Sequence, residues 1–179
     1  MTSYEEVRKQ YRPDHIKLLF IAESPPPPAD IQSSRQFYYT DRIRRDDRLF
    51  INTIKALYPE TAETPEHELE QEKREWLLRL QEDSIYMIEA LEESQAHEIT
   101  KNERQERIRA SLPKLIQRVH TLASGDTRII LIKSNVFDVA AEPLKKAGFR
   151  ILNTELVDYP GRFNQQNYRK KLAKLIESL

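Results

Sequence analysis

The chain of 179 residues contains no cysteine and only three glycines. The absence of cysteine excludes disulfide bonds, thiolate nucleophiles and cysteine-ligated metal sites. With glycine only at positions 125, 148 and 161, the chain cannot form the glycine-rich phosphate loops of Walker-type or dinucleotide-binding proteins. The four histidines are not spaced as metal ligands, so we expect neither a metal nor another cofactor.

The chain also lacks an excess of charge of either sign, because it has 29 basic and 29 acidic side chains. Proteins that coat nucleic acids are strongly basic, so this balance argues against that class but allows a local basic patch. No apolar run is long enough to cross a membrane, and no signal-peptide pattern follows Met1. We therefore expect a cytoplasmic, monomeric protein that has one domain over residues 1–179 and no membrane partner.

Strand-like and helix-like segments alternate along the chain. Four apolar segments have the pattern of β-strands: residues 16–22, 84–89, 127–133 and 149–156. Segments with helical periodicity or helix start signals lie between and after them: about residues 46–58, 64–81, 98–122, 134–147 and 164–179. We expect Pro113 to kink or split its helix. This order predicts a three-layer α/β/α fold with a central, mostly parallel four-stranded sheet.

A carboxylate stands at the end of the first predicted strand. The apolar segment 16–22 is followed by Glu23, Ser24 and the prolines 25–28. A proline cannot continue a central strand because it lacks the N–H that the ladder needs. Ligands of open α/β sheets bind at this carboxyl edge, so Glu23 is the leading candidate for a functional residue. The alternative is a carboxylate that only caps a nearby helix or turn.

Further candidates follow the other strands at the same edge. Glu89 ends the second predicted strand, and the loop 159–162 with Tyr159 and Arg162 follows the fourth. The aromatic run 37–39 lies in the loop after Glu23 and offers stacking surface for a flat ligand. Alternatively, these aromatic residues only anchor a long loop.

The order and spacing of these motifs resemble the uracil-DNA glycosylase superfamily over nearly the whole chain. In that family the first strand ends in Gly-Gln-Asp-Pro or Gly-Glu-Ala-Pro, and an aromatic residue that stacks on the base follows. A Leu-Asn-Ala-Val segment and a His-Pro-Ser motif come later. The corresponding segments here are Ala22-Glu23-Ser24-Pro25, Phe37, Ile88-Glu89-Ala90-Leu91 and Tyr159-Pro160-Gly161.

The resemblance implies hydrolysis of the N-glycosidic bond of a damaged or non-standard base, as in DNA repair by base excision. Glu23, which matches the glutamate of one branch of the family, would position the attacking water and stabilise the sugar cation. Tyr159 would donate a hydrogen bond to the base. The resemblance further implies base-binding residues (Ser24, Phe37 and Glu89) and DNA-binding residues (Pro25 and Arg162). DNA or a nucleotide is the expected partner.

Three positions differ from the family pattern: Ala22 replaces a glycine, Glu89 the base-reading asparagine and Tyr159 a histidine. An ionised Glu89 accepts hydrogen bonds and cannot donate them, so it suits an exocyclic amine better than uracil. Alternatively, Glu89 pairs with a neighbouring arginine and never meets a ligand. The departures keep two other functions open: an inactive nucleotide- or protein-binding module on the same fold, and an unrelated α/β hydrolase or transferase that uses Glu23 as a general base.

Overall fold

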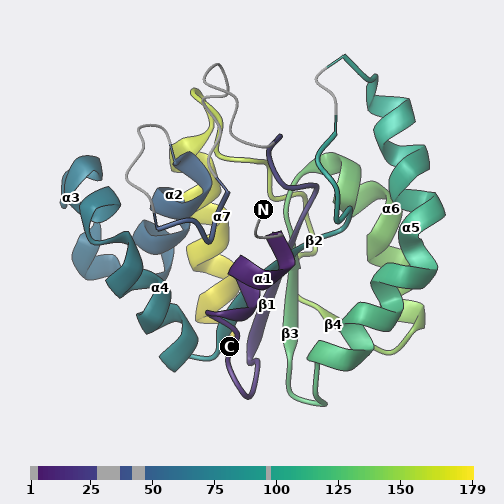
Figure 1. Cartoon of the computed structure of the whole chain (residues 1–179), viewed down its shortest axis with the longest axis horizontal. Helices are drawn as coiled ribbons and strands as arrows, with labels where there is room; N and C mark the ends of the chain where they lie inside the picture. The colour runs from purple at the N-terminus through teal and green to yellow at the C-terminus, as the bar shows by residue number, and fades with distance from the viewer. Residues whose placement is uncertain (1–3, 28–36, 42–46, 96–97) are drawn as a thin grey trace.

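The fold is built on one parallel β-sheet. The computed structural model of the protein describes residues 4–27, 37–41, 47–95 and 98–179. Its sheet has the strand order β2-β1-β3-β4, and every neighbouring pair is parallel. The strands are β1 (Leu18–Ala22), β2 (Ile85–Glu89), β3 (Arg128–Leu131) and β4 (Arg150–Ile151). The predicted four-stranded α/β architecture is therefore confirmed (Figure 1).

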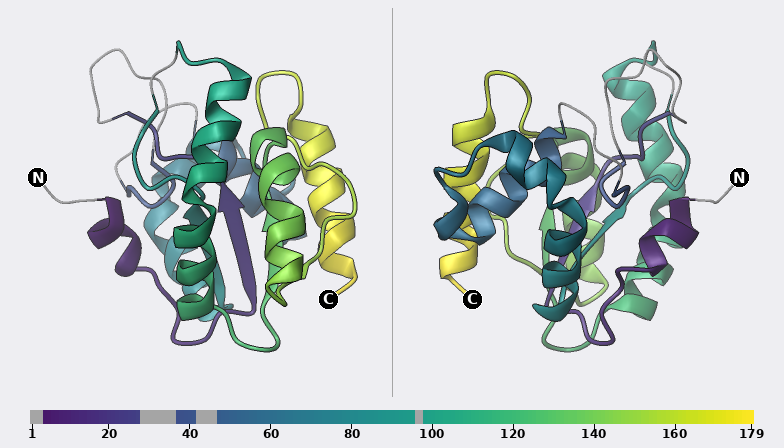
Figure 2. Two further views of the ribbon diagram at one scale, coloured as in Figure 1. Left: turned by 90° about the vertical axis from the view of Figure 1, so that its right-hand side faces the viewer. Right: turned by 60° about the vertical axis from the view of Figure 1, so that its left-hand side comes forward.

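Helices cover both faces of the sheet. They are α1 (Tyr4–Lys9), α2 (Arg48–Leu57), α3 (Glu66–Gln71), α4 (Lys73–Glu82), α5 (Lys101–Leu122), α6 (Ser134–Lys146) and α7 (Gln165–Glu177), with a 3-10 turn at Pro59–Thr61. Helices α5 and α6 lie side by side on one face, and α2, α4 and α7 lie on the other (Figures 1 and 2). The short α1 lies beside the β2 edge of the sheet. Pro28 of the proline run and Asp46, the first residue of the predicted helix 46–58, lie outside the described residues.

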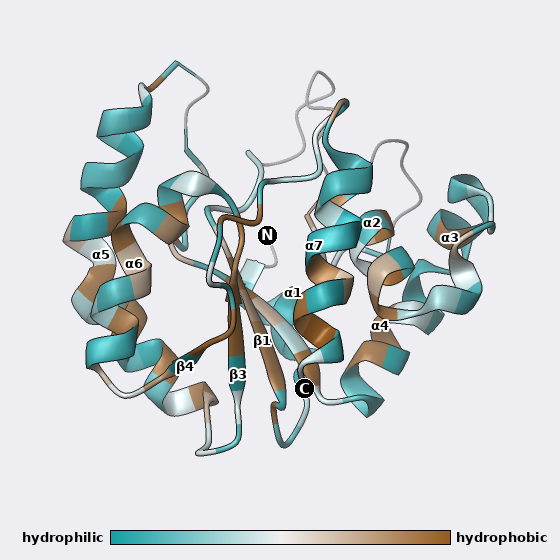
Figure 3. Cartoon of the chain, turned by 180° about the vertical axis from the view of Figure 1, so that it is seen from behind, coloured by the Kyte–Doolittle hydropathy of each residue, from teal (hydrophilic) through white to brown (hydrophobic). Residues whose placement is uncertain are grey.

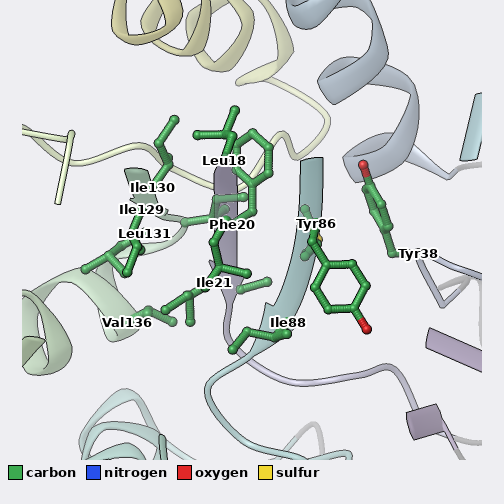
Figure 4. Packing of buried hydrophobic residues seen from close by; sticks show 14 of the residues in the cluster. Leu18, Phe20, Ile21, Tyr38, Tyr86, Ile88, Ile129, Ile130, Leu131 and Val136 are labelled. Carbon is green, nitrogen blue, oxygen red and sulfur yellow. The ribbon is translucent and has the colours of Figure 1, made fainter. Parts of the chain in front are cut away.

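The strands are apolar because both of their faces are covered. All five residues of β1 are buried. Along this strand Leu18 and Phe20 point to one side of the sheet, while Ile21 points to the other, where it meets Ile88 and Val136 (Figure 4). Figure 3 shows the same division, with hydrophobic residues along the strands and hydrophilic residues on the outer sides of the helices. None of the helices in the described ranges has the length and apolar character needed to cross a membrane.

The fourth strand is much shorter than the predicted segment 149–156. Its ladder covers only Arg150–Ile151, followed by an isolated bridge between Ile132 and Val157. Between this ladder and the isolated bridge, the side chain of Asn153 pairs with the backbone of β3. Its Oδ1 accepts from the Leu131 N–H at 3.1 Å, and its Nδ2 donates to the Leu131 carbonyl at 2.9 Å. A side-chain amide thus replaces the backbone partner, and regular strand geometry ends.

Two helix predictions differ from the structure: α5 is not split at Pro113, and the predicted helix 64–81 is divided in two. Helix α5 runs unbroken through Pro113, which is exposed, so water can solvate the carbonyl that loses its partner. It begins with a capping box in which Thr100 and Glu103 exchange side-chain-to-backbone hydrogen bonds. The predicted helix 64–81 is instead two helices, because α3 ends and α4 begins at Glu72.

Candidate functional site

A small cavity lies at the carboxyl edge of β1 and β2. Four residues singled out from the sequence line it: Ser24, Phe37, Glu89 and Tyr159. Its other lining residues are Ala22, Pro26, Tyr38, Asp47, Leu49 and Met87. We call it the edge cavity. Its volume is about 60 Å³.

Strand register decides which side chains reach the edge cavity. The pairing of β1 with β2 aligns Phe20 with Met87 and Ala22 with Glu89. Side chains alternate along a strand, so Ala22, Met87 and Glu89 share one face of the sheet. Glu23 has the opposite parity. It is not among the lining residues, and its carboxylate contacts residues on the face covered by α5 and α6.

Glu23 is held by three donors, which with it form a group that we call the Glu23 cluster. Asn135 donates to its Oε2 at 2.6 Å, and Lys133 and Arg104 donate to its Oε1 at 2.9 and 3.1 Å. Burial raises the pKa of the Glu23 carboxyl, but the hydrogen bonds from Asn135 and Lys133 and the charges of Lys133 and Arg104 outweigh it, so the pKa is lowered overall. Glu23 is therefore ionised at neutral pH and has donors at both carboxylate oxygens.

The backbone of the Glu23 cluster is unusual at Lys133. This residue lies two positions after β3, as the N-cap of α6, and has φ +80° and ψ 142°, a conformation that non-glycine residues rarely adopt. Its N–H donates to the Val157 carbonyl at 2.8 Å, and its ammonium binds Glu23. These two contacts hold Lys133 in the strained conformation at the point where β3 turns into α6.

Glu89 forms a buried ion pair with Arg8. Both side chains are almost fully buried, with 3 % and 2 % of the residue surface exposed, and Arg8 Nη2 donates to Glu89 Oε2. Burial raises the pKa of the Glu89 carboxyl, and the adjacent Arg8 charge opposes this rise. The alternative that Glu89 pairs with an arginine is therefore observed. It does not exclude a ligand, because Glu89 also lines the edge cavity.

Phe37 lines the edge cavity and anchors its own segment. Its ring centroid lies 4.7 Å from that of Tyr4, and the Arg8 guanidinium carbon lies 5.6 Å from it. Two residues on, the Tyr39 hydroxyl accepts a hydrogen bond from the Met87 N–H at 2.6 Å. The anchoring role considered for the aromatic run is thus present, and the ring of Phe37 remains part of the cavity wall.

A second buried carboxylate, Asp47, lines the edge cavity and was missed by sequence analysis. It pairs with Lys73, whose ammonium also donates to the Phe37 carbonyl at 3.2 Å and lies 4.9 Å from the Phe50 ring centroid. Burial raises the pKa of Asp47 and lowers that of Lys73. The sequence did contain a signal for the burial of Lys73: its helical spacing from Leu77 places both residues on the buried face of α4.

The loop after Val157 borders the edge cavity only through Tyr159. Pro25 is buried and is not a lining residue. Arg162 is exposed, and its guanidinium carbon lies 5.7 Å from the ring centroid of Phe163, which is 96 % exposed. The loop therefore presents a cation and an aromatic ring to solvent, three and four residues after a cavity residue.

The sequence-derived candidates thus divide into three groups. Ser24, Phe37, Glu89 and Tyr159 come together in the edge cavity. Glu23 lies in its own cluster, and the two predicted DNA-binding residues lie outside the cavity wall, with Arg162 exposed and Pro25 buried. The edge cavity offers a ligand aromatic surface, the hydroxyl groups of Ser24, Tyr38 and Tyr159, and two buried carboxylates. No protein-family model matches the chain, and neither a curated protein nor a solved structure matches it.

Proposed function

We propose that this protein binds a nucleobase carrying an exocyclic amino group in the edge cavity, as a nucleotide-binding module. The observation that carries this proposal is that Glu89 and Phe37 line the same cavity. An ionised carboxylate has about four acceptor positions, of which Arg8 Nη2 and the backbone N–H of Glu89 itself each occupy one. The others suit an amino group such as that of cytosine or adenine. An aromatic wall suits the flat face of such a base.

The edge cavity must widen to admit a base. Small-molecule pockets have volumes of about 300–1,000 Å³, whereas this cavity has about 60 Å³. The Tyr4 hydroxyl donates a hydrogen bond at 2.6 Å to the carbonyl of Pro26, which is a residue of the cavity wall. We therefore expect ligand entry to separate α1 from the segment around Pro26.

Methionine provides a direct probe of this proposal. The chain has two methionines, Met1 and Met87, and Met87 lines the edge cavity. In protein labelled with 13C at the methionine methyl groups, we expect deoxycytidine and deoxyadenosine to shift the Met87 signal saturably and deoxyuridine to bind more weakly. A Met87→Leu variant assigns the signal. An unmoved Met87 signal, or deoxyuridine binding as tight as that of deoxycytidine, would contradict the proposal.

Hydrolysis of an N-glycosidic bond is the second candidate function, as the resemblance to uracil-DNA glycosylases implies. In its favour, Glu23 is kept ionised and directly precedes Ser24, a residue of the cavity wall. A carboxylate so charged stabilises the positive charge that develops on the sugar when the bond breaks. However, the Glu23 carboxylate contacts Lys133, Arg104 and Asn135, and must leave them to reach a substrate in the edge cavity. Binding therefore ranks first.

Base release distinguishes the two functions. The protein is incubated with single- and double-stranded oligonucleotides that carry uracil, deaminated purines or other damaged bases, and alkali then breaks strands that have lost a base. A binding module leaves every strand intact while still shifting the Met87 signal. Strand breakage by the parent protein that is lost in Glu23→Gln would instead establish a glycosylase and identify its base.

A further inference from the structure

A second cleft, of about 260 Å³, lies where α1, β2 and α5 meet. Basic side chains dominate its lining: Arg8, Lys9, Arg12 and Arg118, with Glu5 as the one acidic lining residue. Tyr86 and Ile88 of β2 supply aromatic and apolar surface. We call it the basic cleft. Its volume approaches the lower end of the range for small-molecule sites, about 300 Å³, and fits a metabolite-sized ligand.

The charges of the basic cleft are only partly compensated. Glu5 and Glu89 contact Arg8, Glu5 lies 4.0 Å from Lys9, and Glu92 lies 3.6 Å from Arg118. Four cations thus face three carboxylates. Among the residues that the structure describes, Arg12 has no ion-pair partner, and it is exposed at the mouth of the cleft. The remaining positive charge favours an anion.

A buried donor of Arg8 is the second, independent observation that points to a ligand. Its Nη1 donates to Glu5 and its Nη2 to Glu89, but its buried Nε has no hydrogen-bond partner within the described chain. Buried donors are almost always paired, because leaving one unsatisfied is costly. A ligand oxygen in the cleft would complete the set of hydrogen bonds that the guanidinium makes.

We propose that the basic cleft binds a small molecule bearing an oxyanion, of which a phosphate monoester fits best. One ligand oxygen accepts from Arg8 Nε, and Arg12 and Lys9 compensate the remaining charge. A guanidinium binds phosphate and carboxylate oxygens through its planar donors, and a doubly charged phosphate gains more from several cations than a single carboxylate does. Tyr86 and Ile88 contact the rest of the ligand. This site is separate from the edge cavity and does not depend on the function proposed for it.

The Nε–Hε signal of Arg8 in a 1H–15N spectrum tests this proposal. The protein is titrated with inorganic phosphate and, separately, with acetate, while sodium chloride keeps the ionic strength constant. We expect phosphate to shift the Arg8 signal saturably. Tighter binding of phosphate than acetate identifies a phosphate ligand, whereas tighter binding of acetate identifies a carboxylate ligand of the same site.

Two variants complete the test. Arg12→Gln removes an exposed cation without disturbing a buried pair, and we expect it to weaken phosphate binding about tenfold or more. Lys170→Gln removes an exposed cation from α7 and serves as the matched control, with unchanged affinity expected. The proposal is overturned if neither anion shifts the Arg8 signal. It is also overturned if Arg12→Gln, like the control Lys170→Gln, binds phosphate as tightly as the parent protein does.

Discussion

Replacing Glu23 by glutamine tests whether the Glu23 cluster is a structural unit. The variant keeps the side-chain shape but removes the charge that Lys133 and Arg104 share. A hydrogen bond to a charged group contributes about 1.5–3 kcal/mol when it is buried. Lys133 and Arg104 are 31 % and 15 % exposed, so water recovers part of this loss. We expect a net loss of about 2 kcal/mol in the free energy of unfolding.

The assay is urea unfolding at pH 7, followed by the fluorescence of the single tryptophan, Trp76. For a chain of this size, a loss of about 2 kcal/mol lowers Tm by about 4–8 °C. The matched control is Glu142→Gln, which removes an exposed glutamate paired with Lys145 on the same helix. Such a surface pair contributes little, so the control changes the free energy of unfolding by about 0.5 kcal/mol or less.

The pH dependence gives a second signature of the same cluster. The folded-state pKa of Glu23 lies below its ordinary value of 4.5. Its stabilisation is therefore complete above the unfolded-state pKa and is lost as the pH falls through the folded-state pKa. The gap in stability between parent and Glu23→Gln should close in acid. Equal stability at pH 7 would refute the reasoning and leave Glu23 available for catalysis. A gap that persists in acid would show that the loss of stability does not come from the charge of Glu23.

Three further predictions each concern one side chain. Tyr4→Phe removes the hydrogen bond to the Pro26 carbonyl. Because this bond ties α1 to Pro26 of the cavity wall, we expect deoxycytidine to bind the variant up to about fivefold more tightly, as measured by the Met87 methyl titration. Asn153→Ala removes both hydrogen bonds to Leu131 and should lower the free energy of unfolding by about 1–3 kcal/mol in urea titrations. Arg162→Gln should weaken binding to an abasic duplex and lower its salt slope by about 1 in a fluorescence anisotropy titration, if the loop contacts one phosphate.

The sequence predicted the sheet because β1 and most of β2 and β3 are apolar runs. The segment 16–22 has hydrophobic residues on both faces, a pattern that only a covered, parallel strand satisfies. The extent of β4 was not predictable, because Asn153 ends the ladder through side-chain contacts with a strand 22 residues away. Local periodicity carries no information on such a contact.

The sequence predicted those cavity residues that lie at or after the end of a strand. Ser24, Glu89 and Tyr159 each follow or end a strand, and the carboxyl edge brings them together. The direction of Glu23 depends on which helices cover each face of β1, and this emerges only in the folded structure. The buried partner Arg8 is 81 residues from Glu89 in the sequence, and it lies in a segment with no apolar pattern.

The most direct test of the account is the relative affinity of the edge cavity for deoxycytidine and deoxyuridine. It is measured by the Met87 methyl titration in the parent protein and in the Arg8→Gln, Glu89→Gln double variant. Changing both residues leaves no buried charge alone. We expect the parent protein to prefer deoxycytidine by about tenfold or more, and the double variant to lose this preference. Equal affinities in the parent, or a preference that survives in the double variant, would contradict the account.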